Sequence, residues 1–259
     1  MRTYICIAFG LMLCLTTNLY AQSSTAESNS NASAEKMNFI KVNLTGLAFK
    51  NYSVQYERVI NRKWSLAFAF RTMPTTHLPF KSQISKAVGT SNPETQTTIE
   101  NMTLSNLAIT PELRFYVGRH GYGRGFYIAP FYRFAKFKSS DITFTYKDNL
   151  NVSSRINLSG DITANTGGIL FGIQRPLGKH LCLDLWLLGP HYGGGKGNFS
   201  GVSDKVLTPF EQDDLRQQLN DIDIPLTKKT VTVTATGANV NLDGPWGGIR
   251  SGISIGFRF

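Results

Sequence analysis

The final thirteen residues, Gly247–Phe259, constrain the fold more than any other stretch of the chain. Every isoleucine and phenylalanine in this segment has an odd number, and both arginines have even numbers. A period of two predicts a β-strand with one apolar face and one polar or small face. About 9 to 11 residues of strand span a bilayer. The segment is therefore long enough to cross a membrane, and it ends the chain on an aromatic residue of the kind found at membrane interfaces.

The first 21 residues have the pattern of an export signal. Arg2 precedes an apolar run from Tyr4 to Leu15, and the small residue Ala21 closes the segment. The apolar run is too short to span a membrane. We therefore expect residues 1–21 to be a signal peptide that is cleaved after Ala21. Residues 22–36, rich in Ser, Asn, Ala and Glu, predict a disordered periplasmic leader.

Cysteine usage and charge narrow the remaining possibilities. Cleavage removes Cys6 and Cys14 and leaves Cys182, so an internal disulfide is excluded. Cleavage also removes Arg2 and no acid, which lowers the formal charge from +10 to +9. For an exported protein this excess favours anionic lipid headgroups over nucleic acid. The mature sequence contains no apolar run of about 18 residues, so any crossing of a membrane must use strands.

Seven further alternating segments precede the last one. They are residues 40–44, 52–57, 64–71, 107–117, 126–135, 168–174 and 181–188. The alternation is weakest in 181–188, where both faces become apolar near Leu188, a residue expected to point inward. The connections at 61–63, 118–125 and 175–180 are short, whereas the loops at 73–101, 138–165 and 192–246 are long. An even strand number with short turns at one end and long loops at the other is typical of outer-membrane barrels. Closure is needed because an open sheet edge cannot be satisfied in lipid.

The sequence thus predicts an all-β fold: an eight-stranded antiparallel transmembrane β-barrel over residues 37–259, with short periplasmic turns and long extracellular loops. One short helix is expected in the last loop, since Thr208, Pro209 and Glu211 form an N-cap, a first-turn proline and an acid three residues on. Its apolar stripe is Leu215, Leu219 and Ile222. A hairpin is expected around Gly237 and Asn239.

Three local features carry separate expectations. Folding the first hairpin symmetrically about Phe49 places Lys41 opposite Glu57. Pro111 and Pro130 each remove a ladder hydrogen bond, which predicts a bulge at similar heights on adjacent strands. The glycine-rich run from Gly193 to Gly197 lacks the strand, lysine and helix order of a phosphate-binding loop, and it predicts a flexible hinge.

Charged residues on the inward faces predict a filled lumen. An eight-stranded barrel is only wide enough inside for side chains. The inward charged set is Lys41, Glu57, Arg71, Glu112, Arg114, Arg133, Asp184 and Arg250. Both signs are present, so we expect an ionic network rather than a passive pore, with glycines of the last strand making room for it.

The sequence predicts no catalytic, cofactor or metal site. The four histidines, His77, His120, His180 and His191, fall in separate turns and loops, so three ligands for zinc are not brought together. His191 lies near the external rim, where a lipid-modifying enzyme would need a serine and an acid beside it. The spacing of the sequence places neither a serine nor an acid beside His191. Three lysines, Lys136, Lys138 and Lys147, alternate with aromatic residues and could bind a polyanion, although at a membrane rim they would more simply face headgroups.

Several segments carry a family resemblance. They are Lys41-Val42-Asn43-Leu44 with residues 52–57, the run 126–133, and Gly244-Pro245-Trp246 leading to residues 256–259. The chain resembles a domain-of-unknown-function family of small, uncharacterised outer-membrane β-barrel proteins of Gram-negative bacteria, over roughly residues 37–259. The resemblance implies a fold and a location, and it implies no activity.

We therefore expect a non-enzymatic outer-membrane barrel with a plugged lumen, with a membrane-structural role or binding a surface ligand through its extracellular loops. The expected partners are membrane lipid, including lipopolysaccharide, and an extracellular ligand; nucleic acid is not expected, and the chain is expected to be a monomer. Three alternatives remain open at this stage. They are an outer-membrane lipid-modifying enzyme near His191, a small-solute transport barrel, and a soluble exported lipid-binding barrel with its apolar faces turned inward.

Overall fold

The computed structural model describes residues 36–77, 101–147, 152–222 and 226–259. The predicted signal peptide, nearly all of the predicted leader, and most of the loop predicted at 73–101 lie outside these residues. Strands dominate the described part of the chain, and two helices accompany them. The strands are β1 (Asn38–Asn43), β2 (Tyr52–Val59), β3 (Trp64–His77), β4 (Thr103–Val117), β5 (Gly125–Lys147), β6 (Ser153–Leu177), β7 (Leu181–Val202), β8 (Lys228–Thr234) and β9 (Gly237–Arg258); the helices are α2 (Leu44–Ala48) and α5 (Pro209–Asp221).

Eight strands form a closed ring. Each of β1 to β7 pairs antiparallel with the next strand, β7 pairs with β9, and β9 returns to β1 through partners such as Val42 and Ile255. Closure leaves no unpaired edge along this part of the sheet. The eight antiparallel ring strands confirm the predicted strand count and order. The short turns fall where they were expected, after β2, β4 and β6.

The ring places apolar side chains outside and charged side chains inside. Phe68 is 50% exposed and Ile253 is 43% exposed, whereas Arg114 and Asp184 on inward positions are fully buried. This arrangement follows the period-two alternation of each strand. It contradicts the alternative of a barrel whose apolar faces turn inward.

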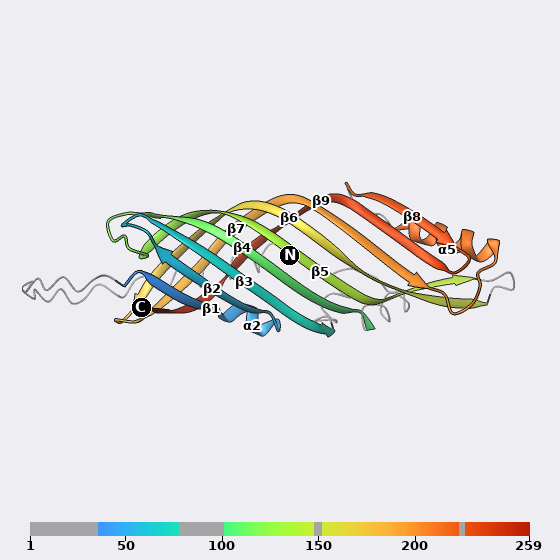
Figure 1. Ribbon diagram of the computed structural model, residues 1–259, viewed down its shortest axis with the longest axis horizontal. Helices are drawn as coiled ribbons and strands as arrows, with labels where there is room; N and C mark the ends of the chain where they lie inside the picture. Colours follow the sequence, from blue (N-terminus) through green and yellow to red (C-terminus); the bar gives the residue numbers. More distant parts are fainter. Residues whose placement is uncertain (1–35, 78–100, 148–151, 223–225) are drawn as a thin grey trace, which may run out of the picture. The chain divides into compact units, whose positions relative to one another are not determined.

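Four strands continue beyond the ring. Figure 1 shows β5, β6, β7 and β9 running on together, with β8 and α5 at their far end. We call this region, the described residues of 139–163 and 196–243, the cap. Most of the predicted loop 138–165, and both ends of the loop 192–246, are therefore paired strand. The expected continuation of strand pairing around Phe144 and Tyr146 is confirmed.

A hydrophobic core lies under α5 in the cap. The buried members come from β5, β6, β8, β9, the helix and the segment just before it; they are Tyr146, Ile156, Leu158, Leu207, Leu215, Leu219, Val233, Ala238 and Val240. The helix begins as predicted, since the Thr208 hydroxyl accepts from the Glu211 amide and the Glu211 carboxylate accepts from the Thr208 amide at 2.8 Å. Leu215 and Leu219 are buried as expected. Ile222 is exposed at the C-cap, because the helix ends at Asp221.

The predicted bulge at the prolines is wrong. Pairing of Phe68 with Pro111, and of Pro130 with Ile169, belongs to registers that run unbroken through both prolines. The two prolines lack amide hydrogens that would bond between β4 and β5. Several residue pairs of these two strands are therefore not formed between Ile109 and Phe115, although the register is the same on both sides of the gap. Both prolines lie on the exposed outer face, so the ladder is interrupted there without an inserted residue.

A bulge occurs instead in β7. The register shifts between Trp186 and Leu188 against β6, and between Trp186 and Gly189 against β9. The consecutive residues Leu187 and Leu188 are 38% and 48% exposed. Leu188 was expected to point inward. A bulge places an extra residue in one strand and allows two successive side chains on one face. This explains why the alternation of the sequence weakens at this point.

The glycine run Gly193–Gly197 is paired strand rather than a hinge, and this expectation is also wrong. Its inward members face close neighbours: a Cβ on Gly193 would lie 2.1 Å from the carbonyl oxygen of Asn165, and one on Gly195 would lie 3.3 Å from the Trp246 side chain. The glycines therefore permit the close approach of β7 to its neighbours β6 and β9.

Candidate functional site

An ionic network fills the ring at the level of Lys41 and Arg114. The Lys41 ammonium contacts Glu57 and lies 2.7 Å from Asp184. The Arg114 guanidinium lies 2.7 Å from the same Asp184 oxygen and 3.0 Å from Glu112. Glu112 in turn binds Arg250 at 2.7 Å. Three cations and three carboxylates thus lie in contact, so the charges in this layer balance.

Neutral groups complete the hydrogen bonding of this network. The Tyr116 hydroxyl donates to Glu57 at 2.6 Å and the Tyr127 hydroxyl donates to Asp184 at 2.7 Å. Gln55 accepts from Arg114 at 2.8 Å. Buried charges are tolerable only when they are paired and hydrogen-bonded. The tyrosines and Gln55 were placed inward by the sequence, but no role in the network was foreseen for them.

The network occludes the ring at this level. Lys41, Arg114, Tyr116 and Tyr127 are among the largest fully buried side chains of the described chain. Gly256 makes the required room, since a Cβ there would lie 2.7 Å from the Lys41 side chain. This confirms the expected role of glycines on the last strand.

The first hairpin joins Lys41 to Glu57 by a different register from the one predicted. Lys41 pairs with Gln55 and Phe39 pairs with Glu57, because α2 occupies the connection and shifts its centre. The long lysine side chain reaches Glu57 along the diagonal of the sheet. The predicted contact between Lys41 and Glu57 is confirmed. The predicted pairing is wrong, because the residue opposite Lys41 is two positions before Glu57 on the same face of β2.

A second group of charges lies between the network and the cap. Arg71 donates to Asn51 at 2.7 Å, and Arg133 donates to Thr110 at 3.3 Å. Neither forms an ion pair with any residue that the structure describes. All eight charged residues predicted to face inward do so, and the two arginines form a basic excess at this end of the ring.

This end of the ring also contains a cavity of about 240 Å³ between α2, β2, β3, β7 and β9. Its lining includes Asn51, Arg71, Trp186 and Arg250. The wall is indented here because β1 ends at Asn43, while β9 continues beyond it. The helix α2 partly covers the β9 edge, and the Thr45 hydroxyl accepts from the Ile253 amide at 2.8 Å.

The histidines are dispersed. His191 packs its ring edge-on against Phe131 at 6.0 Å, and its Nδ1 has no hydrogen-bond partner among the described residues. A serine and an acid hydrogen-bonded to His191, as the lipid-enzyme alternative requires, do not occur in that part of the chain. The described residues also contain no group of three or more His, Cys, Asp or Glu side chains arranged to hold a metal.

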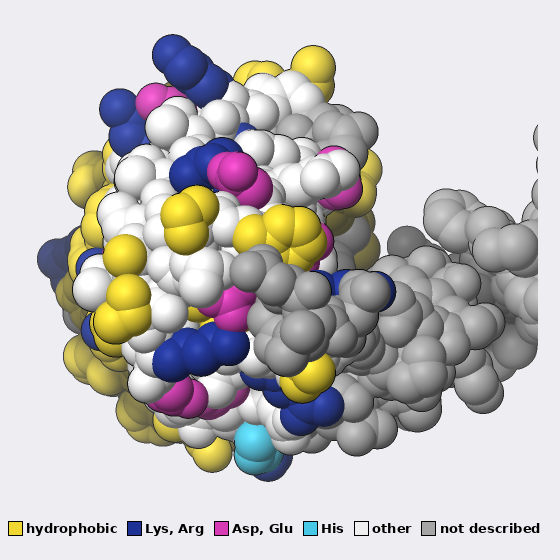
Figure 2. Space-filling model, turned by 90° about the vertical axis from the view of Figure 1, so that its right-hand side faces the viewer, with side chains coloured by type: hydrophobic (Ala, Val, Ile, Leu, Met, Phe, Trp, Pro, Cys, Tyr) yellow, Lys and Arg dark blue, Asp and Glu magenta, His cyan; other side chains and the backbone are white. Residues whose placement is uncertain are grey.

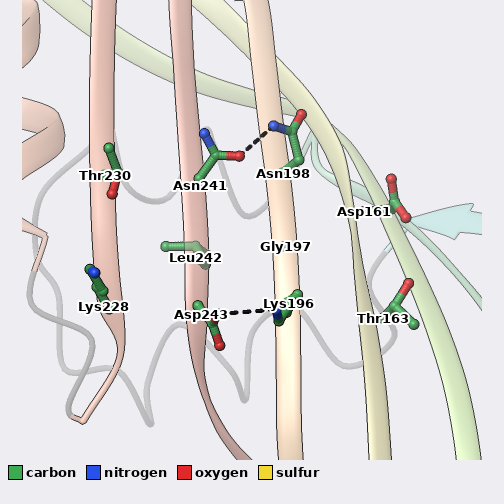
Figure 3. A pocket seen from close by; sticks show the side chains of 10 residues that line it. All are labelled: Asp161, Thr163, Lys196, Gly197, Asn198, Lys228, Thr230, Asn241, Leu242 and Asp243. Atoms are coloured by element: carbon green, nitrogen blue, oxygen red, sulfur yellow. Dashed lines mark hydrogen bonds and ion pairs between the residues drawn. The ribbon is translucent and has the colours of Figure 1, made fainter.

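The outer face of the cap carries a polar groove of about 480 Å³ across β8, β9, β7 and β6 (Figure 3). Two contacts cross its floor, between Asn198 and Asn241 at 2.7 Å and between Lys196 and Asp243 at 3.4 Å. Viewed from the cap end, charged side chains of both signs are scattered among uncharged and hydrophobic ones, and hydrophobic side chains gather along one flank (Figure 2). The groove was not foreseen, because it needs four strands to lie side by side.

The lysine-rich segment of β5 is divided between two environments. Lys136 pairs with Asp161 at 2.8 Å on the outer face. Phe144 and Tyr146 belong to the cap core, so the aromatic residues that alternate with the lysines are not an exposed stacking surface.

No helix in the described residues is long and apolar enough to cross a membrane.

These features define a class of protein: a closed, barrel-like ring of eight antiparallel strands with an occluded, charged interior and a folded cap. The chain belongs to the family described as "Protein of unknown function (DUF3575)", which matches residues 9–193. The match extends further toward the start than the resemblance predicted, and it stops before β9. No curated protein and no solved structure matches the chain.

Proposed function

We propose that this protein is an outer-membrane β-barrel, without enzymatic activity, whose lumen is plugged and whose cap binds a ligand at the cell surface. The observation that carries the proposal is the outward apolar belt of the ring. Ring strands expose apolar side chains on their outer faces, among them Leu66, Phe68, Ile169 and Ile253. A contiguous exposed apolar surface of this extent needs a nonpolar partner, and a closed ring is the sheet form that satisfies its backbone in lipid.

The length of the last strand and the aromatic residues beside the short turns also support the proposal. From Ile249 to Phe259, β9 and the final residue supply 11 residues, which matches the length of a membrane-crossing strand. Phe257 stacks between His180 and Phe259 beside the short turns, with ring centroids at 5.7 and 6.3 Å. Aromatic girdles of this kind mark the interfaces of outer-membrane barrels. We therefore place the short turns in the periplasm and the cap outside the cell.

The ionic network argues against a transport role. A solute path would have to pass Arg114, which is fully buried among Glu57, Glu112 and Asp184. Opening that path would separate several buried ion pairs, each of which is costly to break. The proposed activity therefore belongs to the surface of the cap.

The polar groove in Figure 3 supports a binding role for the cap. Lysine, aspartate, asparagine and threonine side chains line it, which suits a hydroxyl-rich or mixed-charge ligand such as the sugar portion of lipopolysaccharide. Basic and acidic groups alternate across the groove, so a polyanion such as nucleic acid fits less well.

Fractionation and heat-modified gel mobility test the proposal directly. The mature chain should be recovered with the outer membrane, and in SDS it should migrate differently before and after boiling. In planar bilayers the folded protein should give no steady conductance. Recovery of a monomeric, detergent-free, soluble form with no change in mobility would refute the membrane assignment, and a stable ion current would refute the plugged lumen.

A further inference from the structure

We propose that the 240 Å³ cavity between α2, β3 and β9 is a binding site for a phosphate-type anion, held by Arg71 and Arg250. The cavity is lined by residues that the structure describes, and its chemistry does not depend on whether the ring inserts into a membrane. The proposal therefore stands apart from the proposed function of the cap.

The first argument is the presence of unused donors. Arg250 is 7% exposed, and its Nη2 donates to Glu112 while its Nη1 is buried without a partner among the described residues. Trp186 is 9% exposed, and its Nε1–H is likewise buried and unpartnered in that part of the chain. Both side chains line the cavity. Burying a donor without an acceptor is unfavourable, so two such donors on side chains that line one cavity indicate that an acceptor belongs there.

The second argument is the charge balance around the cavity. Arg71 supplies a second guanidinium to the lining, and its one described side-chain partner is the neutral Asn51. Among the residues that the structure describes, Arg250 binds one carboxylate, that of Glu112, which also binds Arg114. Two partly desolvated cations at one cavity repel each other unless a negative charge lies between them. A bound anion would supply that charge.

The third argument is preorganisation. The Arg250 guanidinium lies over the rings of Phe131 and Trp186, with its central carbon 4.5 and 4.8 Å from their centroids. The salt bridge between Arg250 Nη2 and Glu112 holds the edge of the guanidinium that is opposite the unpartnered Nη1. A planar guanidinium held in one orientation presents its donors in a fixed fork, which suits the oxygens of a phosphate.

The cavity also has a route to the outside. Its lining includes Phe49 and Ile249, and both side chains are exposed on the outer face. Inorganic phosphate and the phosphate headgroup of a lipid share the required chemistry and could both enter here.

The test uses the full mature chain folded in a zwitterionic detergent, titrated by calorimetry with two probes at constant ionic strength. The probes are inorganic phosphate and a short-chain phosphatidic acid. The variants are Arg71→Gln, which removes one cation of the site, and Trp186→Phe, which keeps the ring and removes the donor. The matched control is Arg258→Gln, which removes a buried arginine at the opposite end of the ring.

We expect saturable binding of at least one probe by the unchanged chain and by Arg258→Gln. Arg71→Gln should weaken binding by at least about tenfold, the loss expected for one charge-assisted contact, and Trp186→Phe should weaken it by a smaller factor. Binding of phosphate by itself would identify a free anion as the ligand, and binding of phosphatidic acid by itself would identify a headgroup. Unbound probes, or equal binding by the unchanged chain and Arg71→Gln, would overturn the proposal. Should Arg71→Gln fail to fold, Trp186→Phe decides between the same outcomes.

Discussion

The ring and the cap share the strands β5, β6, β7 and β9. The ring has a charged interior and an apolar outer face, whereas the cap has an apolar interior and a polar outer face. Along β6, even-numbered side chains face inward in both regions. In the ring the inward Gln174 is polar and the outward Ile169 is apolar, whereas in the cap the inward Ile156 is apolar and the outward Asp161 is polar. The alternation of β6 stays in phase between the two regions, so the same face of this strand is polar in the ring and apolar in the cap.

The same reversal occurs along β9. In the ring its inward residues include Arg250 and Arg258, and its outward residues include Ile253. In the cap the inward residue Val240 joins the core under α5, and the outward Asp243 lines the polar groove. The sequence Gly244-Pro245-Trp246 lies at the boundary. Period-two geometry thus sets two faces, and the surroundings decide which face is apolar.

The two regions are consequently stabilised by different interactions. The ring interior depends on paired charges, since Lys41 and Arg114 are balanced by carboxylates. The cap interior depends on apolar burial against the helix. In the proposed membrane setting, the inward and outward faces exchange their polarity at the outer edge of the bilayer. Four sets of variants test this difference between the ring and the cap.

The largest effect is expected from removing an interior carboxylate. Asp184→Asn would leave Lys41 and Arg114 short of one counter-charge, and breaking a buried ion pair costs about 3 to 5 kcal/mol. The free energy of unfolding should be measured by urea titration. The matched control is Asp243→Asn in the cap, whose exposed pair with Lys196 is worth about 0 to 1 kcal/mol. Equal losses in both variants would show that the ring interior is not stabilised by charge pairing.

A large effect confined to the cap is expected from Leu215→Ala. This side chain is fully buried between α5 and the strands of the cap, and such a truncation costs about 2 to 5 kcal/mol. Protease digestion should remove the cap from the variant while the ring keeps its heat-modified mobility. Gln217→Ala, on the exposed side of α5, is the control and should resist digestion like the unchanged chain. Simultaneous loss of ring and cap would show that the two regions unfold as one unit.

A comparable or smaller effect is expected from placing a charge on the apolar belt. Ile253→Arg should destabilise the folded state in lipid by about 2 to 4 kcal/mol, the cost of an arginine near the bilayer midplane. Ser159→Arg, at an exposed position of β6 in the cap, should have almost no effect. Unfolding in lipid vesicles measures both. If Ile253→Arg proves as stable as the control, the belt does not face hydrocarbon.

The smallest effect is expected from acid titration of the cap helix. The hydrogen bond from Lys205, then the one from the Thr208 amide, hold the pKa of Glu211 below its usual value of 4.5. A carboxyl group whose pKa is lowered by folding stabilises the folded state above its unfolded pKa and loses that contribution as the pH falls through the folded value. Protease resistance of α5 should therefore decline below about pH 4.5. Glu211→Gln should weaken resistance at neutral pH and flatten this part of the pH profile, and an unchanged profile would contradict the assignment.

Much of the fold could be predicted because it depends on local patterns. Alternation located the eight ring strands and the inward charges, and a capping box located the start of α5 at Thr208. The errors arose where neighbouring strands decide the outcome. Gly193–Gly197 resembles a hinge until β6 and β9 pair with it on both sides, and Leu188 faces outward because β7 bulges against two neighbours.

The candidate sites were harder to predict for the same reason. The cavity brings together Asn51, Arg71, Trp186 and Arg250 from four strands or their connections, and the outer groove needs β6, β7, β8 and β9 side by side. No spacing within one segment encodes either group. A signal was present only in the excess of inward arginines over inward acids.

The order of residues alone determined which positions share a face, because side chains of an extended chain alternate whatever surrounds it. Only the closed sheet decided which charges meet and where a donor is left unmatched. Those contacts join residues as far apart as Lys41 and Asp184, or Glu112 and Arg250. Their distances follow from ring closure and strand register, which are properties of all the strands together.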